Sequence, residues 1–235
     1  MAADEGIETI VATPHVLRGR WRTAPPAELE ARLDELRSRV GDTPRLLLGS
    51  EYFFAHDIAD TLNAGHSIVP LAGGRYVLVE LAANAVPPLI EQPFYRAQLD
   101  GWSIILAHPE RNQVLQSKSD LLVSLIRLGV KVQVTAGSIT GAFGREAQRA
   151  AIDWLRRGYV HFVATDAHSV SKRPPLAREA RQRVAELCGE TVAEALFTDN
   201  PLCVINDVSL AWEPEVPYST AAPGILARIR GLFSK

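Results

Sequence analysis

The segment HFVATDAH, residues 161–168, ends an apolar run with a carboxylate and an imidazole two residues apart, Asp166 and His168. A capping turn would explain this pair, since Asp favours helix starts and the KRPP at residues 172–175 would stop a helix. The same two side-chain types are also ligands for divalent cations. The other strand ends of the chain distinguish the two interpretations.

Four further apolar runs end in residues of the same kinds. TPH supplies His15, GSE supplies Glu51, VE supplies Glu80, and AHPER supplies His108, Glu110 and Arg111. In a parallel α/β sheet or barrel the carboxyl ends of the strands share one face, where functional sites form. Charges gathered on that face would repel one another unless cations held them. Imidazole and carboxylate ligands without a thiolate suit manganese, iron or zinc, so we predict a site for several metal ions.

The elements that must position these residues recur about every thirty residues, the length of a β-α repeat. Short apolar runs rich in Val and Ile predict strands at residues 7–12, 46–48, 76–80, 103–108, 130–135 and 160–165. Helical periodicity predicts helices at residues 26–40, 90–99, 120–128 and 145–157. We therefore expect an α/β fold around a parallel sheet, either open or closed as a barrel. The nucleotide-binding fingerprints GxGxxG and GxxxxGK[ST] do not occur in the sequence.

The composition excludes several other classes of protein. A net charge of -2 over 235 residues gives no general attraction to nucleic acid. No apolar stretch approaches the roughly 20 residues that span a bilayer, and no signal peptide is visible, so we expect a cytoplasmic protein. The two cysteines, Cys188 and Cys203, fit a reducing compartment. Neither has the arginine six positions later that a cysteine-dependent phosphatase needs.

The remaining polar features are expected to be structural or to lie at the surface. His56 and His66 fall in a helix-like segment and a turn, and His161 falls in a strand. After about Thr191 we expect one more helix and then a Pro-rich tail. The basic piece ILARIRGLFSK at residues 225–235 fits an ordinary terminal helix better than a helix that docks on a membrane or a kinase.

The motifs TPH, GSE, VE, AHPERN, QVTAGSITGAFG and HFVATDAH…RPP, in this order from about Gly6 to Leu187, resemble the CpsB/YwqE type of bacterial tyrosine phosphatase in the PHP superfamily. The resemblance implies a distorted, TIM-like β/α barrel with a metal cluster at the strand C-termini, manganese before iron or zinc. It also implies hydrolysis of phosphotyrosine on protein by a metal-activated hydroxide. The expected substrate is the bacterial tyrosine kinase that controls capsule or exopolysaccharide assembly, and homo-oligomerisation stays open.

The resemblance also assigns roles by position. The expected metal ligands are His15, Glu51, Glu80, His108, Asp166 and His168, and the residues expected to hold the phosphate are Arg111 and Arg173. Family members begin with a strand carrying HxH and a helix whose approach carries an acidic ligand, and this sequence has neither. We therefore expect a barrel that lacks its first strand and a cluster with fewer ligands.

The expected phosphatase domain spans residues 1–200, and residues 201–235 are expected to form a C-terminal extension. Two alternatives to the tyrosine phosphatase stay open. One is a related phosphoesterase that acts on histidinol phosphate or on a phosphodiester. The other is a catalytically impaired relative that binds phosphotyrosine through Arg111 and Arg173.

Overall fold

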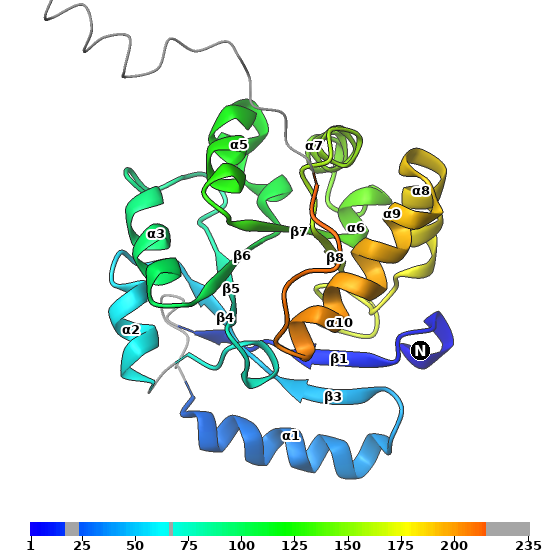
Figure 1. The fold of residues 1–235 in the computed structure, drawn as a ribbon. Coiled ribbons are helices and arrows are strands. Elements are labelled where there is room, and N and C mark those ends of the chain that lie inside the picture. The colour runs from blue at the N-terminus through cyan, green and yellow to red at the C-terminus, as the bar shows by residue number, and fades with distance from the viewer. Residues whose placement is uncertain (17–23, 66–67, 215–235) are drawn as a thin grey trace, which may run out of the picture.

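Parallel strands lie at the centre of the fold and helices cover their outer side (Figure 1). The computed structural model describes residues 1–16, 24–65 and 68–214. One sheet has six strands in the order β2-β4-β5-β6-β7-β8, and β1 pairs with β3 in a second. Their bounds are β1 Thr9–Ala12, β2 His15–Val16, β3 Arg45–Leu48, β4 Glu51–Phe53, β5 Tyr76–Glu80, β6 Ser103–Ala107, β7 Lys131–Thr135 and β8 Phe162–Ala164. The predicted α/β fold with a parallel sheet is confirmed.

The two sheets continue each other through a short interruption. Thr13 and Pro14 separate β1 from β2, and Gly49 and Ser50 separate β3 from β4. The ladder persists across the gap, because the N–H of Gly49 donates to Ala12 O at 2.9 Å and that of Glu51 to Pro14 O at 3.0 Å. The two chain segments therefore run side by side beyond the break, and β2 delivers His15 opposite Glu51.

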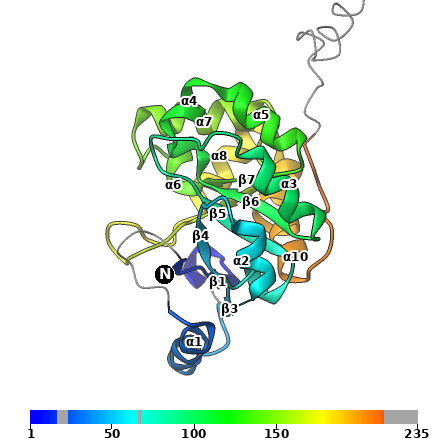
Figure 2. The same ribbon diagram turned by 90° about the vertical axis from the view of Figure 1, so that its left-hand side faces the viewer.

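The helices predicted at residues 26–40, 90–99, 120–128 and 145–157 are confirmed to within one residue at either end, and the structure adds several others. The helices are α1 Pro26–Val40, α2 Ile58–Ala64, α3 Glu91–Leu99, α4 Gln113–Ser117, α5 Ser119–Arg127, α6 Ala136–Ile139, α7 Arg145–Arg156, α8 Arg178–Cys188, α9 Glu190–Glu194 and α10 Asn200–Ile205. Single-turn 3-10 helices span Ala3–Glu5, Leu71–Gly73 and Pro109–Arg111, and a π-helical stretch, Ala195–Asp199, joins α9 to α10. Helix α1 lies beside β3 and apart from the other helices (Figure 2). None of the helices that the structure describes is long and apolar enough to cross a membrane.

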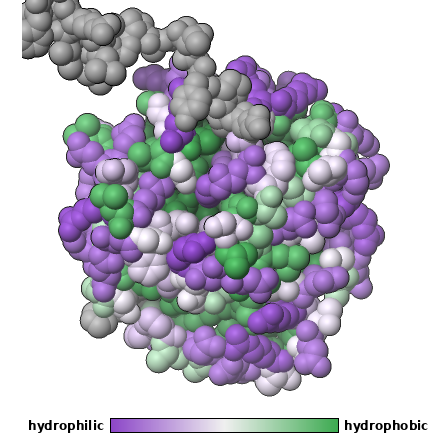
Figure 3. Space-filling view, viewed as in Figure 1, coloured by the Kyte–Doolittle hydropathy of each residue, from purple (hydrophilic) through white to green (hydrophobic). Residues whose placement is uncertain are grey.

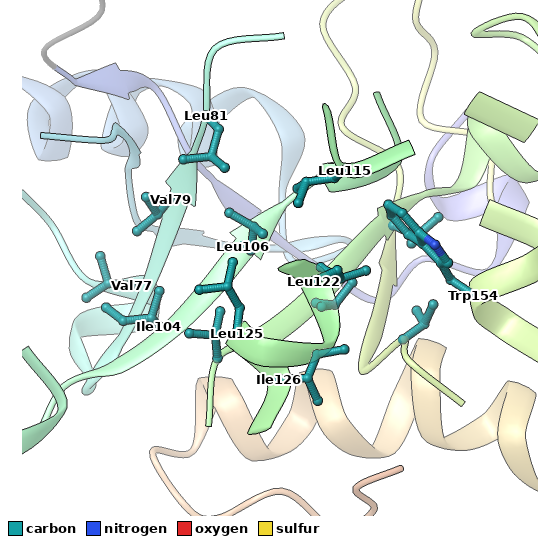
Figure 4. Packing of buried hydrophobic residues seen from close by; sticks show 14 of the residues in the cluster. Val77, Val79, Leu81, Ile104, Leu106, Leu115, Leu122, Leu125, Ile126 and Trp154 are labelled. Atoms are coloured by element: carbon teal, nitrogen blue, oxygen red, sulfur yellow. The ribbon is translucent and has the colours of Figure 1, made fainter. Parts of the chain in front are cut away.

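Alternation along the strands separates two hydrophobic clusters. Val77, Val79, Ile104 and Leu106 point away from the strand axis toward helix residues such as Leu125 (Figure 4). Their sequence neighbours Tyr76, Leu78, Ile105 and Ala107 belong to the second cluster, which also includes Leu71, Phe162 and Val204. Side chains two residues apart share a face of a strand, so Glu80 lies on the same side of β5 as Leu78. Strand ends on this inner side carry the candidate site.

The C-terminal part of the described chain covers the end of the strands opposite to the candidate site. Val204 of α10 joins the inner cluster, and the Asn200 amide bonds to His161 O and to both backbone groups of Trp212. Lys131 pairs with Glu213 at 2.6 Å. The predicted domain boundary after residue 200 would cut α10 at its start, so we propose that the domain extends through Glu213. The basic piece at residues 225–235 lies outside the described residues.

The surface is mixed in polarity. Figure 3 shows hydrophilic side chains over much of the face seen in Figure 1, with smaller hydrophobic areas between them.

Candidate metal centre

Four of the predicted ligands meet at one place: His15 and Glu51 begin β2 and β4, just beyond the carboxyl ends of β1 and β3, and Glu80 and His108 lie at the carboxyl ends of β5 and β6. Glu51 lies between two imidazoles, with its Oε2 at 3.0 Å from His15 Nε2 and its Oε1 at 3.2 Å from His108 Nε2. Nε2 of His108 also lies 3.7 Å from Oε1 of Glu80. Residues separated by 93 positions along the chain thus form one cluster, as the strand-end pattern predicted.

Strand register explains how three of these side chains converge. His15 stands opposite Glu51, and Glu51 stands opposite Leu78, whose side chain belongs to the inner cluster. Glu80 follows two residues after Leu78 and keeps its orientation. His108 is different, because strict alternation after Ala107 would point it outward. Its backbone leaves the strand with φ 35° and ψ 48°, in the left-handed region that non-glycine residues rarely adopt, and this brings its ring to Glu51.

The cluster has the chemistry of a cation site. Glu51 and Glu80 are buried, each 5% exposed. Burial raises the pKa of Glu51, but hydrogen bonds and positive charge from His108 and His15 outweigh burial and hold that pKa well below its usual range. Ligand atoms of His15, Glu51 and Glu80 all lie within 4.8 Å of one another. Bonds of about 2.0–2.3 Å from nitrogen and oxygen to a divalent ion need such a spacing, so these residues fit a metal ion.

The other two predicted ligands lie in a second group with the two predicted arginines. Both Arg111 and Arg173 form ion pairs with Oδ2 of Asp166. His168 places Nδ1 at 3.7 Å from Oδ1 of Asp166. Its ring centroid lies 5.7 Å from that of His15, so the two groups adjoin. Asp166 has φ 49°, a second left-handed residue at a strand end.

The structure thus places Asp166 in a different environment from the one predicted. As a metal ligand its carboxylate would face the ions, whereas here it is the shared acceptor of two guanidinium groups. Charge explains this arrangement, because two cations that converge in a partly buried space need an anion between them. The predicted roles of Asp166 and His168 remain proposals.

Several residues support the arginines, and of these only Glu110 was among the strand-end residues singled out in the sequence, without an assigned role. Glu110 is fully buried and its Oε1 accepts hydrogen bonds from Thr135 N at 3.1 Å and Ser138 Oγ at 2.6 Å. Oγ1 of Thr135 in turn accepts from Nη2 of Arg111 at 3.1 Å. The ring of Phe143 lies against both arginines. Thr135, Ser138 and Phe143 were not predicted to contribute, and their only signal was their place in the motif TAGSITGAFG, whose residues alone indicate no chemistry.

A pocket of about 180 Å³ opens beside the cluster. Glu80, His108 and Arg111 line one part of it. The rest of its wall includes Phe53, Leu81, Ala82, Ala83 and Pro109. The lining of this pocket therefore suits a small ligand that has one charged end and one apolar end.

The other histidines lie outside the cluster. His161 is 2% exposed, and its Nδ1 accepts from the N–H of Val132 at 3.1 Å. Burial, with a smaller contribution from the charge of Lys131, lowers the pKa of His161 to about 3. The buried, hydrogen-bonded ring of His161 fits the predicted structural role. His56 is exposed with Nε2 3.3 Å from Pro88 O, and His66 lies outside the described residues.

Comparison with known proteins places this geometry in a family. The tyrosine-protein phosphatase YwqE of Bacillus subtilis is 32% identical over 92% of this chain and 85% of its own length. The tyrosine-protein phosphatase CpsB of Streptococcus pneumoniae is 28% identical over 86% of both chains. Among solved structures, a chain from the crystal structures of these two proteins, described as unique metal-dependent tyrosine phosphatases, matches with a TM-score of 0.83 and 29% identity over 92% of this chain and 88% of its own. Residues 1–206 match the family described as CpsB/CapC, capsular polysaccharide synthesis. The chain belongs to this CpsB/CapC family.

Proposed function

We propose that the chain is a metal-dependent tyrosine-protein phosphatase of capsule or exopolysaccharide synthesis. The observation that carries the proposal is the contact between two chemically different groups at one set of strand ends. The group of His15, Glu51, Glu80 and His108 has the donors of a divalent metal site. The adjoining pair, Arg111 and Arg173, has the donors of a phosphate site.

The first group would hold the ions through imidazole nitrogens and carboxylate oxygens, with manganese as our first choice and iron or zinc as alternatives. When bound, such ions supply a water activated for attack on phosphorus and charge that stabilises the phosphoryl oxygens. Asp166 and His168 are proposed as further ligands on the side facing Arg173. The short link between His15 and His168, 5.7 Å between ring centroids, supports one continuous site.

Arg111 and Arg173 would bind the phosphoryl group of the substrate. The Oδ2 atom of Asp166 accepts from Nη2 of both residues, so their donors already converge on one oxygen. A phosphoryl oxygen presents the same type of acceptor with more negative charge. Planar guanidinium groups can also contact two oxygens of a phosphate at once, which an ammonium group cannot do with the same geometry.

An aryl phosphate fits the surroundings better than an alkyl phosphate does. The leaving group of phosphotyrosine is a phenolate with a pKa of about 10, so the site needs little help from a general acid. The pocket of about 180 Å³ beside His108 and Arg111 is lined in part by apolar residues, among them Phe53 and Leu81. Engineered cavities of about 150 Å³ accept benzene, so a phenyl ring has room there.

The proposed protein substrate is a bacterial tyrosine kinase of the capsule or exopolysaccharide system. The family's description as capsular polysaccharide synthesis and the names of the curated relatives support a phosphotyrosine protein as the substrate class. The kinase itself is the finer part of the proposal, and its tyrosine-phosphorylated tail is the probe to test.

Initial rates with manganese on three substrates test the proposal: a phosphotyrosine peptide, histidinol phosphate and a nucleotide phosphodiester. We expect hydrolysis of the peptide at a kcat/KM at least tenfold above the other two, lost on addition of a chelator and restored by the metal. Preference for either of the other substrates would replace the proposed activity with that of a related phosphoesterase. Tight binding of the peptide without turnover would make the chain a phosphotyrosine-binding protein.

A further inference from the structure

One aromatic side chain contacts both of the arginines assigned to the phosphate. Phe143 lies in the turn between α6 and α7, in the segment GSITGAFG at residues 137–144. The guanidinium carbon of Arg111 lies 4.5 Å from its ring centroid, and that of Arg173 lies 5.5 Å away. Both distances fall within the about 6 Å at which a guanidinium group is attracted to the face of an aromatic ring. Arg111 ends the 3-10 helix after β6 and Arg173 lies in the loop between β8 and α8, so the ring links two separate segments of the chain.

The local sequence makes room for this ring. A Cβ on Gly137 would lie 2.9 Å from Cε2 of Phe143, so a side chain at this position would displace the ring. Gly141 and Gly144 have φ of 92° and 89°, which allows the sharp turn on either side of the aromatic residue. The N–H of Ala142 donates to Gly137 O at 2.7 Å and closes the turn. Three glycines therefore serve the placement of one phenylalanine.

The ring helps to hold two positively charged guanidinium groups close together, which their hydrogen bonds alone do not achieve. The Nε atoms of Arg111 and Arg173 are buried and make no hydrogen bond within the described part of the chain. Two guanidinium groups that share one acceptor also repel each other. An aromatic face attracts both cations, and it leaves the N–H donors, which lie in the guanidinium plane, available to an anion. A second carboxylate beside Asp166 would instead occupy more of those donors.

We propose that Phe143 is a positioning residue that holds Arg111 and Arg173 together with their donors directed at the phosphoryl group. This inference rests on the proposed function for the role of the two arginines. It assigns to the GSITGAFG motif the preparation of the phosphate site, and it makes Phe143 act through the arginines and not on the substrate directly.

The decisive comparison uses three substitutions. Phe143→Leu keeps an apolar side chain beside Gly137 and removes the aromatic face, whereas Phe143→Tyr keeps that face. Phe197→Leu makes the same chemical change at another partly buried phenylalanine, in the π-helical stretch away from the arginines. For each variant we would measure the dissociation constant of inorganic phosphate by calorimetry, kcat and KM on a phosphotyrosine peptide, the metal content and the melting temperature.

We expect Phe143→Leu to weaken phosphate binding and to raise KM by roughly tenfold, with metal content as in the unchanged protein. Phe143→Tyr should stay within about threefold of the unchanged protein, because the cation–aromatic contact persists. In an Arg111→Ala background, Phe143→Leu should change phosphate affinity by much less, since the nearer of the two cations is gone. Phe197→Leu should lower the melting temperature only.

Two results would overturn the role of Phe143: equal phosphate affinities for the unchanged protein and Phe143→Leu, or the full loss in the Arg111→Ala background as well. Because phosphate affinity is measured without turnover, these results are distinct from failure of the proposed function. That failure would appear as an unchanged protein that does not hydrolyse the peptide.

Discussion

His15 and Glu51 stand opposite each other on two neighbouring parallel strands, with Nε2 of the histidine 3.0 Å from Oε2 of the glutamate. Since His108 contacts the other oxygen, Glu51 is the residue on which the cluster converges. Glu51→Gln keeps the shape and removes the charge. We expect the variant to lose manganese, measured by elemental analysis, and to lose at least about 100-fold in kcat/KM.

Glu186→Gln is the matched control for this prediction, because Glu186 pairs with Arg183 on the surface of α8. It should keep full metal content and activity. Retention of stoichiometric metal by the Glu51→Gln variant would show that the ions bind elsewhere.

The two arginines offer a second prediction. Arg111→Lys and Arg173→Lys keep the positive charge and lose the planar fork that would contact two phosphoryl oxygens. We expect each to lower kcat/KM on a phosphotyrosine peptide by about 10- to 100-fold while the metal content stays unchanged. Arg181→Lys, in a surface pair with Glu190 and Glu194, is the control. Loss of metal in the arginine variants would argue for a structural role through Asp166.

The strand ends were predictable from the sequence because both periodicity and residue type mark them. Runs such as YVLVE predicted β5 at its observed bounds, and its terminal Glu80 faces the cluster. The prediction was less complete where one strand is interrupted. IETIVA marked β1 but not β2, since two residues of strand after Thr13-Pro14 carry no pattern.

Contacts between distant loops were the part that the sequence could not provide. The pairing of Asp166 with Arg111 joins positions 55 residues apart, and no local pattern encodes it. Phe143 belongs to the motif GSITGAFG, whose glycines have the wrong spacing for either nucleotide-binding fingerprint. Only the fold shows that the turn places its ring against two guanidinium groups.

Metal binding should stabilise the folded protein. Glu51 and Glu80 are both buried, and a cation between them would bind the folded chain only. At 100 times its dissociation constant a ligand of this kind adds about 2.7 kcal/mol to the free energy of unfolding. We expect manganese to raise the melting temperature of chelator-treated protein, as followed by scanning fluorimetry. An equal rise in the Glu80→Gln variant would contradict binding at this cluster.

Asn112 is predicted to contribute to stability and not to chemistry. Its Oδ1 accepts from the N–H groups of Val114 and Leu115 at 3.0 and 2.9 Å, which caps α4. Its Nδ2 donates to the carbonyls of Ala82 and Ala85 at 2.7 and 2.9 Å, which fixes the loop after β5.

Because these groups are largely buried, Asn112→Ala should lower the free energy of unfolding by about 2–4 kcal/mol in urea denaturation. Asn112→Asp keeps the cap but sets a carboxylate oxygen, which cannot donate, against the carbonyls of Ala82 and Ala85, so we expect a loss at least as large. The exposed Asn206→Ala serves as the control. A negligible effect of Asn112→Ala would mean that water replaces these bonds.

His161 predicts a specific dependence of stability on pH. Burial lowers its pKa to about 3 in the folded chain, against about 6.5 in the unfolded chain. Between these pH values the unfolded chain binds more protons than the folded chain. The contribution of His161 to the free energy of unfolding is therefore full above about pH 6.5 and is lost as the pH falls toward 3. The slope approaches about 1.4 kcal/mol per pH unit. Urea denaturation of metal-free protein between pH 7.5 and 4.5 measures it.

His161→Asn isolates this contribution from those of other groups, because the amide oxygen can accept from Val132 N in place of Nδ1 and does not titrate. As the pH falls below about 6.5, the unfolding free energy of the unchanged protein should decrease relative to that of this variant. His56→Asn, at an exposed histidine, should leave the slope unchanged. A parallel pH dependence in the unchanged and His161→Asn proteins would show that the His161 ring reaches solvent and is protonated in the folded state.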